Sequence, residues 1–259
     1  MIFRWLRNAR RRRLWAQPFP EQWQAILERN VRLYRQLTAG EQAKIRDDLR
    51  VFVAEKNWEG CGGLTLTDEI RVTIAAQISI LVLGFQQQYF RNVLSILIYP
   101  NAYIAPDQTI TRAGVVLEGD SARSGEAWYR GPVILSWADA LAGARGHSGG
   151  DNLVFHEFAH QLDMLHGRTV NGTPPMQSSE QYRRWTEIMT EHYNGLLYDC
   201  QHGQHTLLDC YGATDLSEFF AVATETFFER PSAMQRRHPK LYDILREFYR
   251  QDPAAREAA

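Results

Sequence analysis

The chain has 259 residues, of which 44% are hydrophobic and 23% are charged, and this composition excludes collagen-like and largely disordered proteins. The 29 Lys and Arg residues nearly balance the 30 Asp and Glu residues, so the formal net charge is −1. Such a balance argues against a generally basic nucleic-acid binder, and we expect no direct nucleic-acid partner.

Residues 1–19 are expected to be a basic arm, because they begin with the arginine-rich sequence MIFRWLRNARRRR. They are not expected to be a secretory signal, because no apolar core follows the basic residues. A solvated arm is favoured over one that contacts an anionic lipid or an acidic partner. The longest apolar run, at residues 74–85, is too short to span a bilayer. Three cysteines outside any C-x-x-C motif are expected to be small buried residues in a reducing compartment. We therefore expect a cytoplasmic protein with no membrane span.

Apolar residues after the arm recur at helical spacing, which predicts helices at residues 20–37, at 42–56 and from Thr67 to about Leu83. The middle of the chain is richer in β-forming residues. It predicts strands at residues 93–99, 114–118 and 132–137, without regular βαβ alternation.

The last third of the chain is expected to be helical again. Asp151 or Asn152 can cap a helix that ends at His166. Capping residues farther along the chain, Ser178 and Asp215, predict the starts of helices at residues 178–197 and 215–230. The fold class expected is α+β, a single domain over residues 20–250 with a helical N-terminal part, a small mixed sheet and a tail at residues 251–259.

The most informative motif is His156-Glu157-Phe158-Ala159-His160, an H-E-x-x-H sequence in the helix expected from residue 152. Positions i and i+4 of a helix lie one above the other, so two imidazoles can bind one zinc ion. Glu157 then lies near the open coordination position, where a carboxylate can take a proton from water. The motif predicts a hydrolytic zinc site, and a metal-free polar helix face is the alternative.

A catalytic zinc ion needs a third protein ligand, for which the sequence offers two residues. His166 has the metzincin spacing H-E-x-x-H-x-x-G-x-x-H, but Asp163 replaces the glycine that breaks the helix. Glu218 occupies the place of a gluzincin glutamate on a later helix, or it completes a capping box with Asp215. Both alternatives stay open on these grounds.

Two segments together resemble the Mlc titration factor A family of zinc peptidases: H-E-F-A-H-Q-L-D-M at residues 156–164, and a tyrosine followed by Glu-Phe-Phe-Ala at residues 211–221. The spacing of Tyr211 and Glu218 is also similar to that in the catalytic domain of anthrax lethal factor. The resemblance extends over most of the chain and implies a gluzincin-like metallopeptidase with a zincin-like fold.

The resemblance also implies roles for individual residues. His156, His160 and Glu218 would bind one zinc ion per chain, and Glu157 would act as general base. Tyr211 would stabilise the oxyanion of the tetrahedral intermediate, a role that suits a phenol because its O–H donates to developing charge. Members of the family bind the repressor Mlc, which implies control of glucose-uptake genes, and the family suggests aminopeptidase-like activity.

Two acidic residues are candidates for orienting the zinc ligands. Asp163 lies on nearly the same helix face as His160, and Glu225 lies two turns beyond Glu218. Each could accept the second N–H of a zinc-bound imidazole, or be an ordinary surface or ion-paired carboxylate. The strand around Pro132 is expected either at a sheet edge, where extended substrate can bind, or in the core.

The sequence therefore predicts a zinc-dependent, aminopeptidase-like peptidase that also binds the repressor Mlc. A non-catalytic zinc protein that sequesters a repressor and a metzincin-like site with His166 are the alternatives. A G-x-S-x-G match at residues 146–150 favours a serine hydrolase only weakly, because no convincing strand precedes it.

Overall fold

The computed structural model describes residues 2–86, 89–101, 131–166 and 170–257, without the side chains of residues 2–4, 6 and 166. Most of these residues are helical, and the described strands form one small parallel sheet within a single domain. The described residues therefore contain more helix and less strand than the expected α+β class suggests. The strand expected at residues 114–118 lies outside the described residues.

The N-terminal helices are α1 (Ile2–Ala16), α2 (Glu21–Asn30), the 3₁₀ helix η1 (Leu33–Gln36), α3 (Ala39–Glu55) and α4 (Asp68–Leu81). The single helix expected at residues 20–37 is wrong, because Val31 is extended and the Arg32 N–H donates to the Ala144 carbonyl instead. Helix α3 begins earlier than expected because Thr38 and Glu41 form a capping box. Most of the segment expected to be a basic arm forms helix α1.

The sheet has the order β1 (Asn57–Gly60), β2 (Ser95–Tyr99) and β3 (Val133–Ser136), with parallel pairing throughout. Strands β2 and β3 confirm two of the expected strands, and Ile96 and Ile98 of β2 are buried, as alternation requires. Strand β3 lies at one end of the three described strands, as an edge strand does. The expectation of a mixed sheet is wrong for the described strands. Strand β1 is a strand that the sequence pattern missed.

The C-terminal elements are α6 (Trp137–Arg145), α7 (Leu153–Asp163), η2 (Met164–His166), α8 (Ser179–Gln201), η3 (Cys210–Ala213), α9 (Leu216–Glu229), α10 (Pro231–Arg237), α11 (Pro239–Tyr249) and α12 (Pro253–Glu257). The Asn152 side chain caps α7 by accepting from the Phe155 N–H, as predicted. Helix α6 precedes the G-x-S-x-G segment, so the strand that a nucleophile elbow requires is absent from the described residues there.

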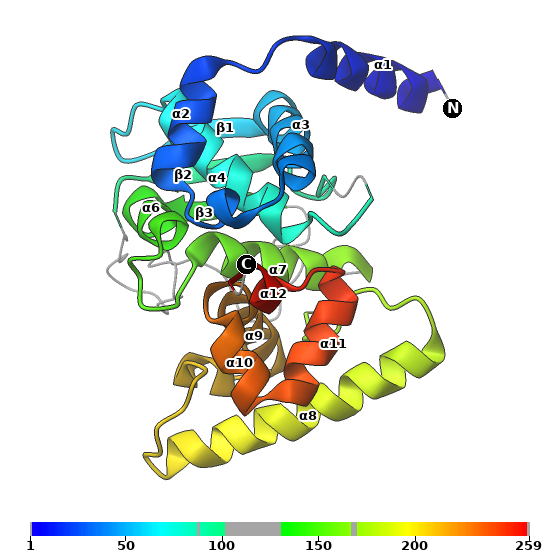
Figure 1. Ribbon diagram of the computed structural model, residues 1–259, viewed down its shortest axis with the longest axis vertical. Helices are drawn as coiled ribbons and strands as arrows, with labels where there is room; N and C mark the ends of the chain where they lie inside the picture. Colours follow the sequence, from blue (N-terminus) through cyan, green and yellow to red (C-terminus); the bar gives the residue numbers. More distant parts are fainter. Residues whose placement is uncertain (1, 87–88, 102–130, 167–169, 258–259) are drawn as a thin grey trace.

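Helix α7 lies between the sheet with its neighbouring helices and the C-terminal helices (Figure 1). Its Phe158 packs against Phe90 on one side, and its Phe155 packs against Phe228 of α9 on the other. Helix α9 is buried along almost its whole length. No helix in the described part of the chain has the length and apolar character that a bilayer span requires.

Candidate metal centre

Helix α7 places the two histidines of the H-E-x-x-H motif side by side. Their Nε2 atoms lie 3.2 Å apart, and their ring centroids are 4.9 Å apart. His156 is buried and His160 is partly buried, because the surrounding positions of α7 are apolar and face the core. The local helix therefore positions two nitrogen ligands at the spacing that one metal ion needs.

Glu218 reaches the histidines from the first turn of α9. Asp215 caps this helix, because its Oδ1 accepts the N–H groups of Ser217 and Glu218 at 2.8 and 3.0 Å. The Glu218 carboxylate points to the histidines, with Oε2 3.0 Å from His156 Nε2 and 3.5 Å from His160 Nε2. The cap and the ligand geometry thus occur together, on neighbouring residues.

The donor set fits a metal ion. The ligand atoms of His156, His160 and Glu218 lie within 4.8 Å of one another. Within the described residues, these three form the cluster of His, Cys, Asp or Glu side chains that could hold a metal ion. Despite its short distance to His156, the buried Oε2 of Glu218 makes no hydrogen bond of suitable geometry there. A buried carboxylate oxygen without a donor is costly, and a cation at this point would remove the cost.

The second ring nitrogen of each histidine has a partner on α9. His156 Nδ1 lies 2.8 Å from Oε1 of the buried Glu225, as the sequence suggested. His160 Nδ1 lies 3.0 Å from Ser217 Oγ, a partner that sequence reasoning missed because a serine has no recognisable spacing signal. Such contacts set the ring orientation and the tautomer of a metal-ligating histidine.

Asp163 has another task in the structure. Its carboxylate accepts the backbone N–H groups of Asn171, Gly172 and Thr173 at 2.7 to 2.9 Å. It therefore holds the backbone of residues 171–173, and the partner of His160 Nδ1 is Ser217 instead of Asp163, which the sequence offered as one candidate. The backbone of His166 lies in η2, and its side chain is outside the described residues.

Burial and charge shift the titration of the site. Burial lowers the pKa of His156, but the carboxylates of Glu218 and Glu225 outweigh this and raise the pKa to about 10. Burial also raises the pKa of the Glu157 carboxyl above its ordinary value. The two histidines lower the pKa of Glu218, although burial alone would raise it. The site thus combines one ionised carboxylate with one that holds its proton more strongly.

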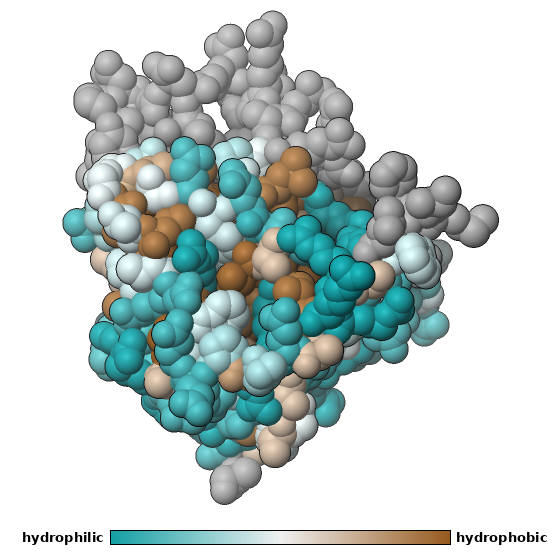
Figure 2. Space-filling view, turned by 90° about the horizontal axis from the view of Figure 1, so that it is seen from above, coloured by the Kyte–Doolittle hydropathy of each residue, from teal (hydrophilic) through white to brown (hydrophobic). Residues whose placement is uncertain are grey.

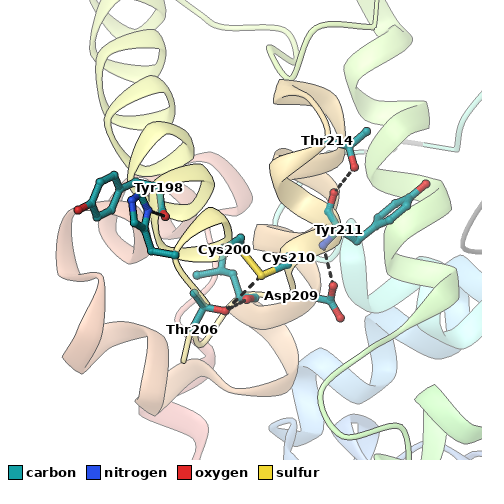
Figure 3. The surroundings of a disulfide bond; sticks show 9 residues. Tyr198, Cys200, Thr206, Asp209, Cys210, Tyr211 and Thr214 are labelled. Atoms are coloured by element: carbon teal, nitrogen blue, oxygen red, sulfur yellow. Dashed lines mark hydrogen bonds between the residues drawn. A yellow bond between two sulfur atoms is a disulfide. The ribbon is translucent and has the colours of Figure 1, made fainter. Parts of the chain in front are cut away.

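Tyr211 lies in η3, and its ring centroid is 6.0 Å from that of His156. The Tyr211 N–H donates to Asp209 at 2.7 Å, and the ring points away from a disulfide between Cys200 and Cys210 (Figure 3). The disulfide joins the end of α8 to the first residue of η3. The expectation of small buried cysteines is therefore wrong for this pair. The loop between α8 and η3 brings the two helix ends together, and no cysteine motif in the sequence indicates this.

A cavity lies beside His156 and the carboxylate of Glu225. It has a volume of about 160 Å³, and residues of α6 and of the loop before α7 also line it, among them Asp139 and Ser148. The Ser148 hydroxyl donates to the Asp151 carbonyl. The chemistry that this part of the molecule offers therefore centres on the histidines and carboxylates.

Comparisons with known proteins agree with this chemistry. The family model described as glucose-regulated metallo-peptidase M90 matches residues 5–250. An uncharacterized protein of Synechocystis, slr2042, is 39% identical over 250 residues, covering 96% of this chain and 90% of the relative. Mlc titration factor A of Yersinia enterocolitica is 30% identical over 237 residues, covering 91% and 87% of the two chains. The protein of that name from Yersinia pestis is 30% identical, with 91% and 86% covered.

Proposed function

The chain belongs to the glucose-regulated metallopeptidase M90 family, and from this premise we propose that it is a zinc-dependent peptidase with aminopeptidase-like activity. The observation that carries the proposal is the convergence of His156, His160 and Glu218 beside Glu157. Family membership implies a metal ion, and two histidines with one carboxylate are the protein ligands of many catalytic zinc sites.

A zinc ion held by His156, His160 and Glu218 would supply Lewis-acid polarisation of the peptide carbonyl and a more acidic water. The chain orients that set, since Glu225 and Ser217 hold the two imidazole rings from α9. This places the orienting groups on one rigid, buried helix, which limits ring rotation during a reaction.

Glu157 accepts a proton from the attacking water in this proposal and delivers it to the leaving amine. Burial raises the pKa of Glu157, and a more basic carboxylate is a better proton acceptor. Tyr211 donates its phenol O–H to the oxygen that becomes negative. Its place beside His156 supports this role, because the centroids of the two rings are 6.0 Å apart.

The variant Glu157→Gln tests the mechanism. We expect peptide hydrolysis to fall by about 100- to 10,000-fold, as loss of positioned acid–base catalysis does. The zinc content measured by elemental analysis should stay at one ion per chain, because Glu157 is not a ligand. The matched control Glu180→Gln, an exposed glutamate on α8, should change neither quantity. Near-normal turnover in Glu157→Gln would overturn the mechanism.

Two further variants test the ligand set. Glu218→Ala should reduce bound zinc, whereas His166→Ala should leave it unchanged. Loss of zinc in His166→Ala alone would instead establish the metzincin-like alternative. A protein that takes up no zinc when zinc is supplied would overturn the proposed cofactor.

The second candidate function is binding of the repressor Mlc, which the relatives named Mlc titration factor A favour. A protein that binds a DNA-binding repressor acts in the cytoplasm of a bacterium, and we propose that compartment. Binding that survives Glu157→Gln would separate it from hydrolysis. Hydrolysis by a chain that binds no Mlc would leave only the peptidase function.

A further inference from the structure

Helix α1 carries a charge unlike that of the rest of the chain. It holds six arginines, whereas all 30 Asp and Glu residues lie outside it. In Figure 1 the helix lies at the margin of the molecule, and its N-terminal end is the part farthest from the other helices. The body of the protein is therefore acidic, and one projecting helix is strongly basic.

One face of α1 is bound to the body. Arg11 donates two hydrogen bonds to Glu55 of α3, at 2.7 and 2.6 Å, and its guanidinium lies 4.1 Å from the centre of the Tyr89 ring. Trp15, one turn later, donates its indole N–H to the Asp47 carbonyl at 3.1 Å. These contacts set the rotation of α1 about its own axis, so its other face has a defined direction.

The outward face combines an aromatic residue with arginines. Trp5 is 65% exposed. Arg12 lies seven residues later, on the same side of the helix, and both Arg12 and its neighbour Arg13 are exposed. Figure 2 views this end of the molecule and shows a largely hydrophilic surface with small hydrophobic patches. An exposed indole with exposed arginines on the same helix is the pattern of helices that lie in a lipid–water interface.

We propose that α1 binds the surface of an anionic phospholipid membrane through Trp5, Arg12 and Arg13. The indole enters the interfacial layer, where its ring is in apolar surroundings and its N–H stays hydrated. The guanidinium groups contact lipid phosphates and are drawn to the negative surface. A duplex nucleic acid would use the arginines but offers no apolar layer for Trp5.

Sedimentation of the full chain with vesicles tests the proposal. We expect binding to vesicles of equal parts phosphatidylglycerol and phosphatidylcholine, and none to pure phosphatidylcholine. Added salt should weaken the binding, since exposed charges are screened. Arg12→Glu should lower the apparent affinity about tenfold or more, because it removes one attraction and adds one repulsion. Trp5→Ala should lower it to a similar degree, because the interfacial anchor is lost.

Matched controls separate this surface from general stickiness. Tyr198→Ala removes another exposed aromatic, and Arg236→Glu reverses another exposed arginine, and both should bind as the unaltered chain does. Thermal melts should be the same for all variants, because none of these side chains is buried. Equal binding to both vesicle types, or loss of binding in the controls, would overturn the proposal. Duplex DNA bound in place of vesicles, with no effect of Trp5→Ala, would also overturn it.

Discussion

Helices α8 and α9 both pack in the C-terminal half, but the charged contacts of α9 are buried and those of α8 are exposed to solvent. Helix α9 meets α7 with Glu225 only 2% exposed. Helix α8 meets α11 through Arg184 and Glu247, whose side chains are 49% and 47% exposed. Water can replace a lost partner in the second contact but not in the first. Charged residues are therefore buried in the contact that α9 makes with α7 and exposed in the contact that α8 makes with α11.

The buried charges of α9 form a continuous path from the candidate metal centre to the N-terminal region. Glu225 accepts from His156 and from the Asn152 N–H. The Asn152 amide donates to Glu229 at 3.0 Å, and Arg32 pairs with Glu229 at 2.6 Å. Five residues from three segments thus depend on one another, so the comparison with α8 can be tested by removing them singly.

The largest effect is expected from Glu225→Ala. It leaves the Asn152 N–H and the buried His156 ring without their acceptor. We expect the free energy of unfolding to fall by about 3 to 5 kcal/mol, as for other broken buried pairs. Urea denaturation of the metal-free protein measures this. A loss below about 1 kcal/mol, the value typical of exposed pairs, would remove the distinction between α9 and α8.

Cys200→Ser tests the strongest attachment of α8. The disulfide to Cys210 ties the end of α8 to η3, and its loss should cost about 2 to 4 kcal/mol because the unfolded chain gains freedom. With dithiothreitol present, the variant and the unaltered protein should unfold at the same urea concentration. Cys61→Ser, at the free cysteine, is the control. A difference that persists in reductant would show that packing, not the cross-link, holds this end.

Arg32→Ala probes the outer end of the α9 path. Removing a charged hydrogen bond to Glu229 should cost about 1.5 to 3 kcal/mol at neutral pH. Burial already raises the pKa of Glu229 above its ordinary value of 4.5, and loss of Arg32 should raise it further. A carboxyl with a raised folded-state pKa favours the folded state at low pH, and this contribution is lost as pH rises through the raised pKa.

The cost of Arg32→Ala should therefore be smaller at pH 4.5 than at neutral pH. Urea denaturation at the two pH values measures the difference. A cost that is independent of pH would mean that Glu229 stays ionised without Arg32, and the α9 path would then resemble an exposed contact.

The smallest effect is expected on the α8–α11 surface. Arg184→Ala, Glu247→Ala and the double variant should each change stability by about 0.2 to 1 kcal/mol, with a coupling that salt abolishes. A coupling free energy above that range would mean that the exposed α8–α11 contact stabilises the fold as strongly as the buried α7–α9 contact. Thermal denaturation of the four proteins closes the cycle.

Local patterns predicted much of the helical structure. The Asn152 cap, the helix over His156 and His160, and the start of α9 at Asp215 all follow from residues within a few positions of one another. Strand β1 and helix α10 were missed, because short elements with weak periodicity depend on their neighbours. The break after α2 was missed for a related reason, since a carbonyl of α6 takes the Arg32 N–H.

The sequence by itself determined the pair of histidines and the adjacent Glu157, because helical geometry alone sets a spacing of four residues. Only the tertiary structure decided that Ser217 meets His160, that Asp163 turns to a loop, and that Cys200 meets Cys210. These contacts join segments whose approach depends on how α7, α8 and α9 pack. Packing is a property of the whole core, and no local spacing encodes it.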